Sequence, residues 1–428
     1  MSISQSLSPE WRLLLLACVA PQPASAAGRR LEQQAGDGAL DWDRVVDCAG
    51  EHDIGPLAYH GLQPFAISGD RAQAVLAKLK AQYFASAMRN ALLYRELKDL
   101  LRALGRRNRP VILLKGAALA ATVYRTAALR PRGDVDLLIR RDDLSEVEKL
   151  FEDFGYILDD GHRLRNEWYR AHHYHLTFQK RLGNPFTMCC EIHWRIDRPG
   201  SRFAIDINGV WARATAASVD DVDLRVLSPE DLLLHLCLHT CKHHLVGGFR
   251  AFCDIAAVVQ RHGRSLDWEQ VRTRALEWRI GPFVYVPLRI VQELLGVDVP
   301  ASVLSGLVAE DFDDRLVNAA IAEALEKRLS ANLFEPFMHL RYGRSLAERG
   351  LVLRSVFSRA AIAERYGLPP ASRKIYWYYP RRLKDVTTDY GPELWRFVRR
   401  GRQTIAQAEG RSQLAEWLAP LQEDASPV

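Results

Sequence analysis

The chain has 428 residues, of which 48% are hydrophobic, and its 58 Lys and Arg against 52 Asp and Glu give a formal net charge of +6. This length suits two or three globular domains, and no segment approaches the ~20 apolar residues that a membrane-spanning helix needs. The mild basic excess is compatible with anionic substrates such as nucleotides, but it is no strong nucleic-acid signal by itself.

The N-terminal segment WRLLLLACVAPQPASAA contains a short apolar run and an ASA tripeptide that resembles a signal-peptidase site. Glu10 and Arg12 leave it without net positive charge, and Ser8 as a cap with Pro9 at the first position favours a helix instead. The seven cysteines have no regular spacing, which predicts free thiols and a reducing compartment. We therefore expect a cytoplasmic protein.

Apolar residues recur at helical spacing through residues 8–104, and the last of these helices is predicted to stop at Gly105. Four segments then read as strands: PVILLKG, DVDLLIRR, YHLTFQK and FTMCCEIHWRI, with a turn at RLGNP between the last two. AALAATVY and DDLSEVEKLFEDFGY read as the intervening helices. This order predicts a small mixed sheet with helices on one face.

From SPEDLLLHLCLHTCKH onward the pattern is helical again, with Ser228 as the cap and Pro229 at the first position. We predict the α+β fold class in three parts: an N-terminal helical region (1–108), a mixed-sheet core (109–226) and a C-terminal helical region (227–428). A basic aromatic segment, RKIYWYYPRRLK, occupies residues 373–384. We favour aromatics that pack inward there, and peripheral membrane contact through Trp and Tyr is the next alternative.

Two carboxylates, Asp134 and Asp136, lie one residue apart at the start of the DVDLLIRR strand. Strand side chains alternate between faces, so the two point the same way and repel each other. A divalent cation removes this repulsion, and Mg²⁺ favours one or two carboxylates together with substrate phosphates. A lone Asp-x-Asp is more often a solvated strand end, but Glu191 in the TMCCEIHW strand offers a third carboxylate for the same metals.

Lys115 and Gly116 lie at a strand-to-helix junction, where a helix N-terminus binds phosphate and a glycine permits close approach. Arg130 and Arg132 add positive charge beside the aspartates. Metal ligands, a phosphate cradle and nearby cations are together what metal-assisted phosphoryl transfer requires.

The KG…Y…RPxGDxD pattern resembles that of uncharacterised bacterial nucleotidyltransferases of the DNA polymerase β superfamily. The resemblance covers roughly residues 10–265, including EIHWRI and LSPEDLLLHLCLHTCKH, and extends more loosely into the tail through YWYYPRRL. It implies a nucleotidyltransferase core between the two helical regions. The matching residues are Lys115, Gly116, Tyr124, Arg130, Pro131, Gly133, Asp134 and Asp136.

The resemblance also implies a two-metal Mg²⁺ site, with Mn²⁺ as an alternative, in which Asp134 and Asp136 bind both metals and the triphosphate. Glu191 would bind the metal that activates the acceptor hydroxyl and could act as general base. The implied reaction moves a nucleoside monophosphate from an NTP, with ATP favoured, to an unidentified acceptor and releases pyrophosphate. The residues expected to contact the nucleotide are Lys115, Gly116, Arg130, Arg132 and Gly133.

The phosphate-binding turn departs from the superfamily pattern, which usually has Gly-Gly or Gly-Ser followed by the Asp pair about ten to a dozen residues later. Here the turn is Gly116-Ala117, and Asp134 follows 134 − 116 = 18 positions after the glycine. The serine that would contact a phosphate is absent, so Lys115, Arg130 or Arg132 would have to replace it.

His235, His239 and His243 recur at four-residue spacing and therefore share one helix face. Two such histidines can bind zinc, but the glutamate of the His-Glu-x-x-His pattern is missing. His239, His243 and Asp254 match the family pattern, as does Tyr124, so we expect them to support the active site.

Two other classes remain open. His52-Asp53 permits a His-Asp metal phosphohydrolase, but the remaining His and Asp of such a site lack a convincing helical frame. A non-catalytic member that binds a nucleotide or a partner is the stronger alternative, although a protein without catalysis has no reason to retain three like charges. No residue pattern indicates the acceptor or the oligomeric state.

Overall fold

The structure is a computed structural model that describes residues 7–325 except 20–21, 39, 132, 160–169, 171–172, 184–185, 220, 243–244, 246–247 and 310–311. Beyond residue 325 it describes 362, 375–382, 384, 414 and 417. The chain divides into two compact units, Met1–Leu325 with Pro420–Val428, and Glu326–Ala419. The predicted division at residues 108 and 226 stays a prediction.

The N-terminal region is helical, as predicted. Ser8 accepts a hydrogen bond from the Trp11 N–H at 3.4 Å and Pro9 is the first helical residue, so the expected cap is confirmed. The helices are α1 (Pro9–Cys18), α2 (Ala26–Ala35), α3 (Trp42–Glu51), α4 (Gly55–Leu62) and α5 (Asp70–Arg106).

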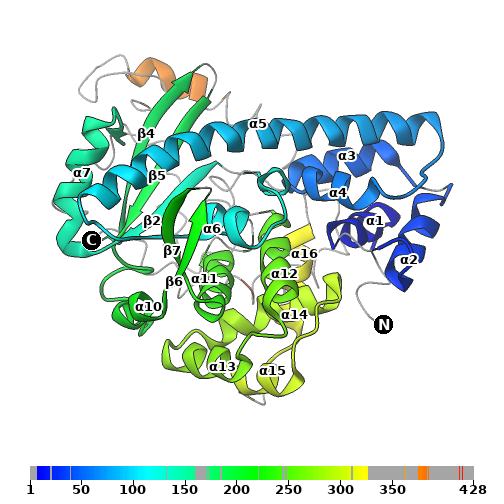
Figure 1. Cartoon of the computed structure of the whole chain (residues 1–428). Coiled ribbons are helices and arrows are strands. Elements are labelled where there is room, and N and C mark those ends of the chain that lie inside the picture. Colours follow the sequence, from blue (N-terminus) through cyan, green and yellow to red (C-terminus); the bar gives the residue numbers. More distant parts are fainter. Residues whose placement is uncertain are drawn as a thin grey trace. The chain divides into compact units, whose positions relative to one another are not determined.

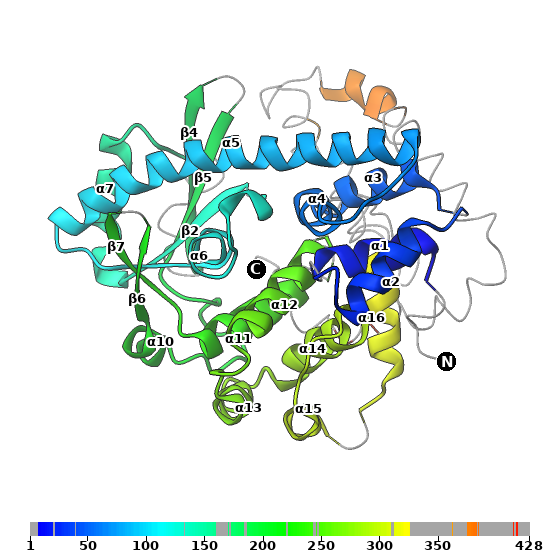
Figure 2. The same ribbon diagram turned by 45° about the vertical axis from the view of Figure 1, so that its right-hand side comes forward.

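Helix α5 connects these helices to the sheet. It is 37 residues long and runs from α3 and α4 along the sheet (Figures 1 and 2). Leu93, Leu97, Leu100 and Leu104 recur every three or four residues and are buried against the strands. The N-terminal helices and the sheet are therefore held together by one continuous element.

A seven-stranded mixed sheet forms the core, in the order β3-β4-β5-β2-β1-β7-β6. The four predicted strands are present, and β2 pairs antiparallel with β1 and parallel with β5. The strands are β1 (Val111–Leu113), β2 (Asp134–Ile139), β3 (Ile157–Leu158), β4 (His175–Gly183), β5 (Phe186–His193), β6 (Thr215–Val219) and β7 (Val222–Val226).

Strands β3, β6 and β7 were not predicted. Strand β3 has only two residues, too few for a periodic signal, and β6 is mostly exposed Ala, Ser and Thr. Strand β7 does alternate between buried and exposed residues in VDLRV, and it pairs parallel with β1. That short alternation could have indicated β7 from the sequence.

The two faces of the sheet differ in character. Val135, Leu137 and Ile139 of β2 point into a core shared with α5 and α7, whereas Asp134 and Asp136 point to the opposite face. The apolar face is therefore covered by helices and the other carries the carboxylates, as the alternation predicts. The shorter helices of the core are α6 (Lys115–Thr122), η2 (Ala127–Leu129), η3 (Arg141–Asp143), α7 (Leu144–Asp153) and α10 (Ile207–Arg213).

The chain after β7 is helical, as predicted, and Ser228 caps the first helix by accepting from the Asp231 N–H at 3.2 Å. All seven cysteines are free, which confirms the expected thiols. No helix within the described part of the chain is both long and apolar enough to span a membrane. The helices are α11 (Pro229–Lys242), α12 (Arg250–His262), α13 (Trp268–Glu277), α14 (Gly281–Leu295), α15 (Ala301–Leu307) and α16 (Arg315–Leu325).

The basic aromatic segment is described at 375–382 and 384. Ile375 is buried with Ile362, and Tyr378 and Tyr379 pack against them. Trp377 is 85% exposed, so inward packing holds for only part of the segment. The membrane contact stays a prediction.

Candidate active site

Strand register brings the predicted carboxylates together. In the parallel pair of β2 and β5, Asp136 lies opposite Glu191, so both side chains point to the same face. His193 follows Glu191 by two positions and therefore shares that face. Its Nε2 lies 3.0 Å from Asp136 Oδ1 and 3.2 Å from Glu191 Oε2.

One ligand atom each from Asp136, Glu191 and His193 lies within 4.8 Å of the others. Carboxylate oxygens with an imidazole nitrogen form a donor set that suits a divalent cation. The sequence interpretation missed His193, although the two-residue strand period from Glu191 could have indicated it. Asp134 is outside this triad but lines the cavity beside it.

Lys115 contacts the same carboxylates from the start of α6. Its Nζ lies 2.5 Å from Asp136 Oδ1 and 3.7 Å from Glu191 Oε2. Burial favours the neutral amine, but the charges of Asp136 and Glu191 outweigh it and raise the pKa of Lys115. Its backbone φ of 41° lies in the left-handed region, where a non-glycine residue is uncommon. The chain is thus strained at the residue that reaches the carboxylates.

The two aspartates have opposite electrostatic environments. Burial and the neighbouring charge of Asp136 raise the pKa of Asp134. Burial also opposes ionisation of Asp136, but the Lys115 charge and the His193 contact outweigh it and hold the Asp136 pKa well below its usual range. Asp136 is therefore the firmly ionised member of the pair.

A cavity of about 280 Å³ lies over this face of the sheet. Helix α11 supplies one wall, and burial lowers the pKa of His235 there to about 3, so its imidazole is neutral near pH 7. The predicted residues Lys115, Asp134, Glu191 and His239 line the cavity, while His243 and Arg132 lie outside the described residues. The other lining residues are Tyr174, His175, His193, Ile196, His235, Leu238 and Lys242.

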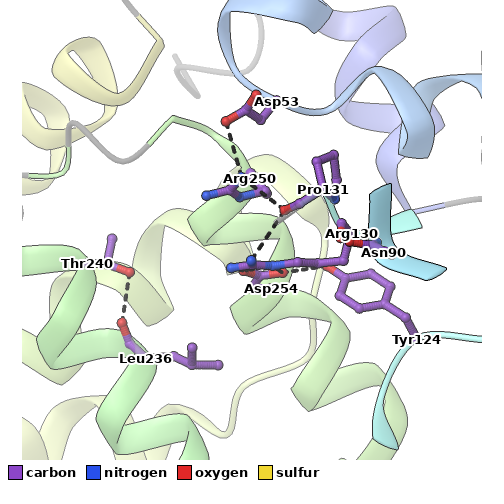
Figure 3. A network of polar contacts seen from close by, with 9 residues as sticks. All are labelled: Asp53, Asn90, Tyr124, Arg130, Pro131, Leu236, Thr240, Arg250 and Asp254. Carbon is purple, nitrogen blue, oxygen red and sulfur yellow. Dashed lines mark hydrogen bonds and ion pairs between the residues drawn. The ribbon is translucent and has the colours of Figure 1, made fainter. Parts of the chain in front are cut away.

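Arg130, which we expected to contact the nucleotide, is buried in an ion pair. It donates through Nε and Nη2 to Asp254 Oδ2 at 3.1 and 2.9 Å, and the Tyr124 hydroxyl donates to Asp254 Oδ1 at 2.8 Å (Figure 3). Asn90 of α5 donates to the Arg130 carbonyl at 3.0 Å. Arg250 of α12 donates to the Pro131 carbonyl at 3.2 Å. Three residues of the sequence pattern thus join α12 and α5 to the segment that leads into Asp134.

The glycine of the turn is explained by the same ion pair. A Cβ on Gly116 would lie 2.1 Å from Arg130 Nη1, whereas a Cβ on Gly133 would meet nothing within 4 Å. Gly116 therefore makes room for a guanidinium. Its predicted phosphate contact, and that of Gly133, stay predictions.

We expect Gly116→Ala to lower the free energy of unfolding by about 1–3 kcal/mol, the usual cost of overpacking a buried site. The clash is with a side-chain end, but Arg130 cannot swing away without losing Asp254. Denaturant unfolding measures the change. Gly105→Ala is the control, because its new Cβ meets nothing within 4 Å, and it should stabilise α5 slightly. Equal effects of the two substitutions would contradict this explanation.

His52 and Asp53 have structural partners. His52 Nδ1 accepts from the Phe249 N–H at 3.2 Å, and Asp53 pairs with Arg250 at 3.1 Å. Both residues fix the start of α12, and neither belongs to the metal-ligand triad found among the described residues.

The fold and the site define an α+β protein with a candidate metal centre on the carboxylate-bearing face of a mixed sheet, beside a cavity walled by α11. A family model described as an uncharacterised nucleotidyltransferase matches residues 38–296. Because this is more than half of the chain, the protein belongs to that nucleotidyltransferase family. Comparisons with curated proteins and with solved structures gave no match.

Proposed function

We propose that the protein is a Mg²⁺-dependent nucleotidyltransferase that transfers a nucleoside monophosphate from an NTP, with ATP as the first candidate, to a hydroxyl or phosphate acceptor. The observation that carries this proposal is the meeting of Asp136, Glu191 and His193 beside Lys115, next to a cavity that Lys115, Glu191 and His193 line. Paired strand carboxylates with a nearby cation suit a triphosphate and its metals.

Each residue has a distinct role in the proposed reaction. A divalent cation at Asp136, Glu191 and His193 would supply positive charge where charge develops on the transferred group. Asp134 lines the cavity and would be a further carboxylate ligand for the metal. A bond forms between an acceptor oxygen and the α-phosphorus, the α–β phosphoanhydride bond breaks and pyrophosphate leaves. Where the acceptor is a hydroxyl, Glu191 takes its proton.

The structure supports the predicted nucleotide contacts to different degrees. The contact of Lys115 has the strongest support, because Lys115 lines the cavity. Arg130 has the least, because its guanidinium is paired with Asp254. We therefore assign the triphosphate to Lys115 and give Arg130 the task of holding the turn beside it.

Transfer of label from NTPs carrying ³²P at either the α or the γ position tests the proposal. Full-length protein with Mg²⁺ should move the α label, and not the γ label, into a component of a cell extract, and EDTA should stop the transfer. Transfer of the γ label would instead indicate a kinase. Nucleotide binding without any transfer would support the non-catalytic alternative.

A further inference from the structure

An ammonium group occupies the candidate metal site. Lys115 Nζ contacts Asp136 Oδ1 at 2.5 Å and lies 3.7 Å from Glu191 Oε2, so it faces two of the three candidate metal ligands. The side chains of Lys115 and Asp136 are only 12% and 2% exposed. Water therefore screens this contact poorly, and the ion pair is stronger than a surface pair.

The ammonium and a metal ion would compete for the same atom. Asp136 Oδ1 already accepts from Lys115 and lies 3.0 Å from His193 Nε2. A divalent cation at Asp136, Glu191 and His193 would stand against the Lys115 charge at a separation where like charges repel strongly. Metal entry therefore requires the ammonium to leave Asp136.

The lysine has another partner available only when a nucleotide is present. Lys115 lines the cavity and begins α6, so the cavity is within its reach when it leaves Asp136. A triphosphate offers anionic oxygens there, and its charge offsets that of the metal. The other lysine that lines the cavity, Lys242, is paired with Asp197.

We propose that Lys115 is a positioning residue that stands in for the metal ion, holding Asp136 and Glu191 until a metal–nucleotide complex displaces it. Metal and nucleotide then bind interdependently: the free metal binds weakly, and the nucleotide strengthens its binding by accepting the ammonium. This inference rests on the proposed function for the identity of the nucleotide. Its central claim, competition between Lys115 and a divalent cation, concerns the protein without nucleotide.

Binding of Mn²⁺ alone tests the claim, with free Mn²⁺ measured by electron paramagnetic resonance. We expect Lys115→Met to bind Mn²⁺ at least about tenfold more tightly than wild type without nucleotide. Lys242→Met is the matched control, because it removes a lysine of the same cavity that pairs with Asp197 instead of the metal ligands. The Mn²⁺ affinity of Lys242→Met should stay within about threefold of wild type. This variant therefore measures how much the loss of one positive charge changes Mn²⁺ binding when the charge does not contact the metal ligands.

A second measurement uses a non-hydrolysable ATP analogue. The analogue should tighten Mn²⁺ binding to wild type and have a much smaller effect on Lys115→Met, which has no ammonium for the nucleotide to draw away from Asp136. Lys115→Gln serves if the Met variant does not fold, and Mn²⁺ should raise the Tm of either variant more than that of wild type.

Equal Mn²⁺ affinities for the Lys115 and Lys242 variants would overturn the inference. Such a result is distinct from failure of the proposed function, which the absence of α-label transfer would reveal. If Lys115→Met binds Mn²⁺ more tightly but the wild-type protein transfers no α label, the competition is established and the proposed reaction is refuted.

Discussion

Asp136→Asn is expected to reduce kcat/KM for nucleotide transfer by at least about 10³-fold, the scale of losing a central electrostatic group. Asp136 is 1% exposed and lies in the candidate metal triad. The amide keeps the shape of the carboxylate but loses its charge, so it binds a divalent cation poorly. The substitution also removes the carboxylate that Lys115 contacts at 2.5 Å, so the ammonium loses its nearest partner.

The α-label transfer assay measures this loss, and far-UV circular dichroism checks that the fold is intact. Asp223→Asn is the matched control, because Asp223 is a strand aspartate of the same sheet with an exposed side chain. It should keep wild-type turnover. Full activity of Asp136→Asn would refute the assignment of this residue, whatever the acceptor proves to be.

Asp254→Ala is expected to lower the free energy of unfolding by about 3–5 kcal/mol, because removal of one partner leaves the Arg130 charge buried and unpaired. The Tyr124 hydroxyl loses its acceptor in the same step. Because this network holds the segment before Asp134, turnover should also fall in the folded fraction.

Denaturant unfolding measures the effect, with Asp221→Ala as the control for an exposed pair. Asp221 contacts Arg102 at 2.8 Å, but its side chain is 69% exposed, so its loss should change stability little. The double variant Arg130→Met with Asp254→Leu removes both charges and should recover part of the stability. An Asp254→Ala protein as stable as Asp221→Ala would contradict a buried ion pair.

The fold was predictable where the local pattern is strong. The cap at Ser8, the helix that ends near Gly105 and the four main strands follow from side-chain periodicity and cap chemistry. Strand β6 was missed because its residues are mostly exposed and small or polar, and β7 because its alternation spans only five residues. Its pairing with β1 is a contact between distant segments, which no local window contains.

The candidate site divides in the same way. The strand period of two showed that Asp134 and Asp136 share a face, and it could have added His193 to Glu191. Which residues share a strand face follows from the assigned strand and the residue numbers alone. The sequence alone therefore determined the acidic face and, through the KG…Y…RPxGDxD pattern, the family to which the chain belongs.

The tertiary structure decided what the remaining residues of that pattern do. Arg130 and Asp254 are 124 positions apart, and only packing of α12 against the core makes them partners. The same packing places the Arg130 guanidinium against Gly116, a reason for the glycine that the sequence did not indicate. It also sets Lys115 against Asp136. A charge's partner depends on which groups burial brings within a few ångströms, and spacing along the chain carries no such information.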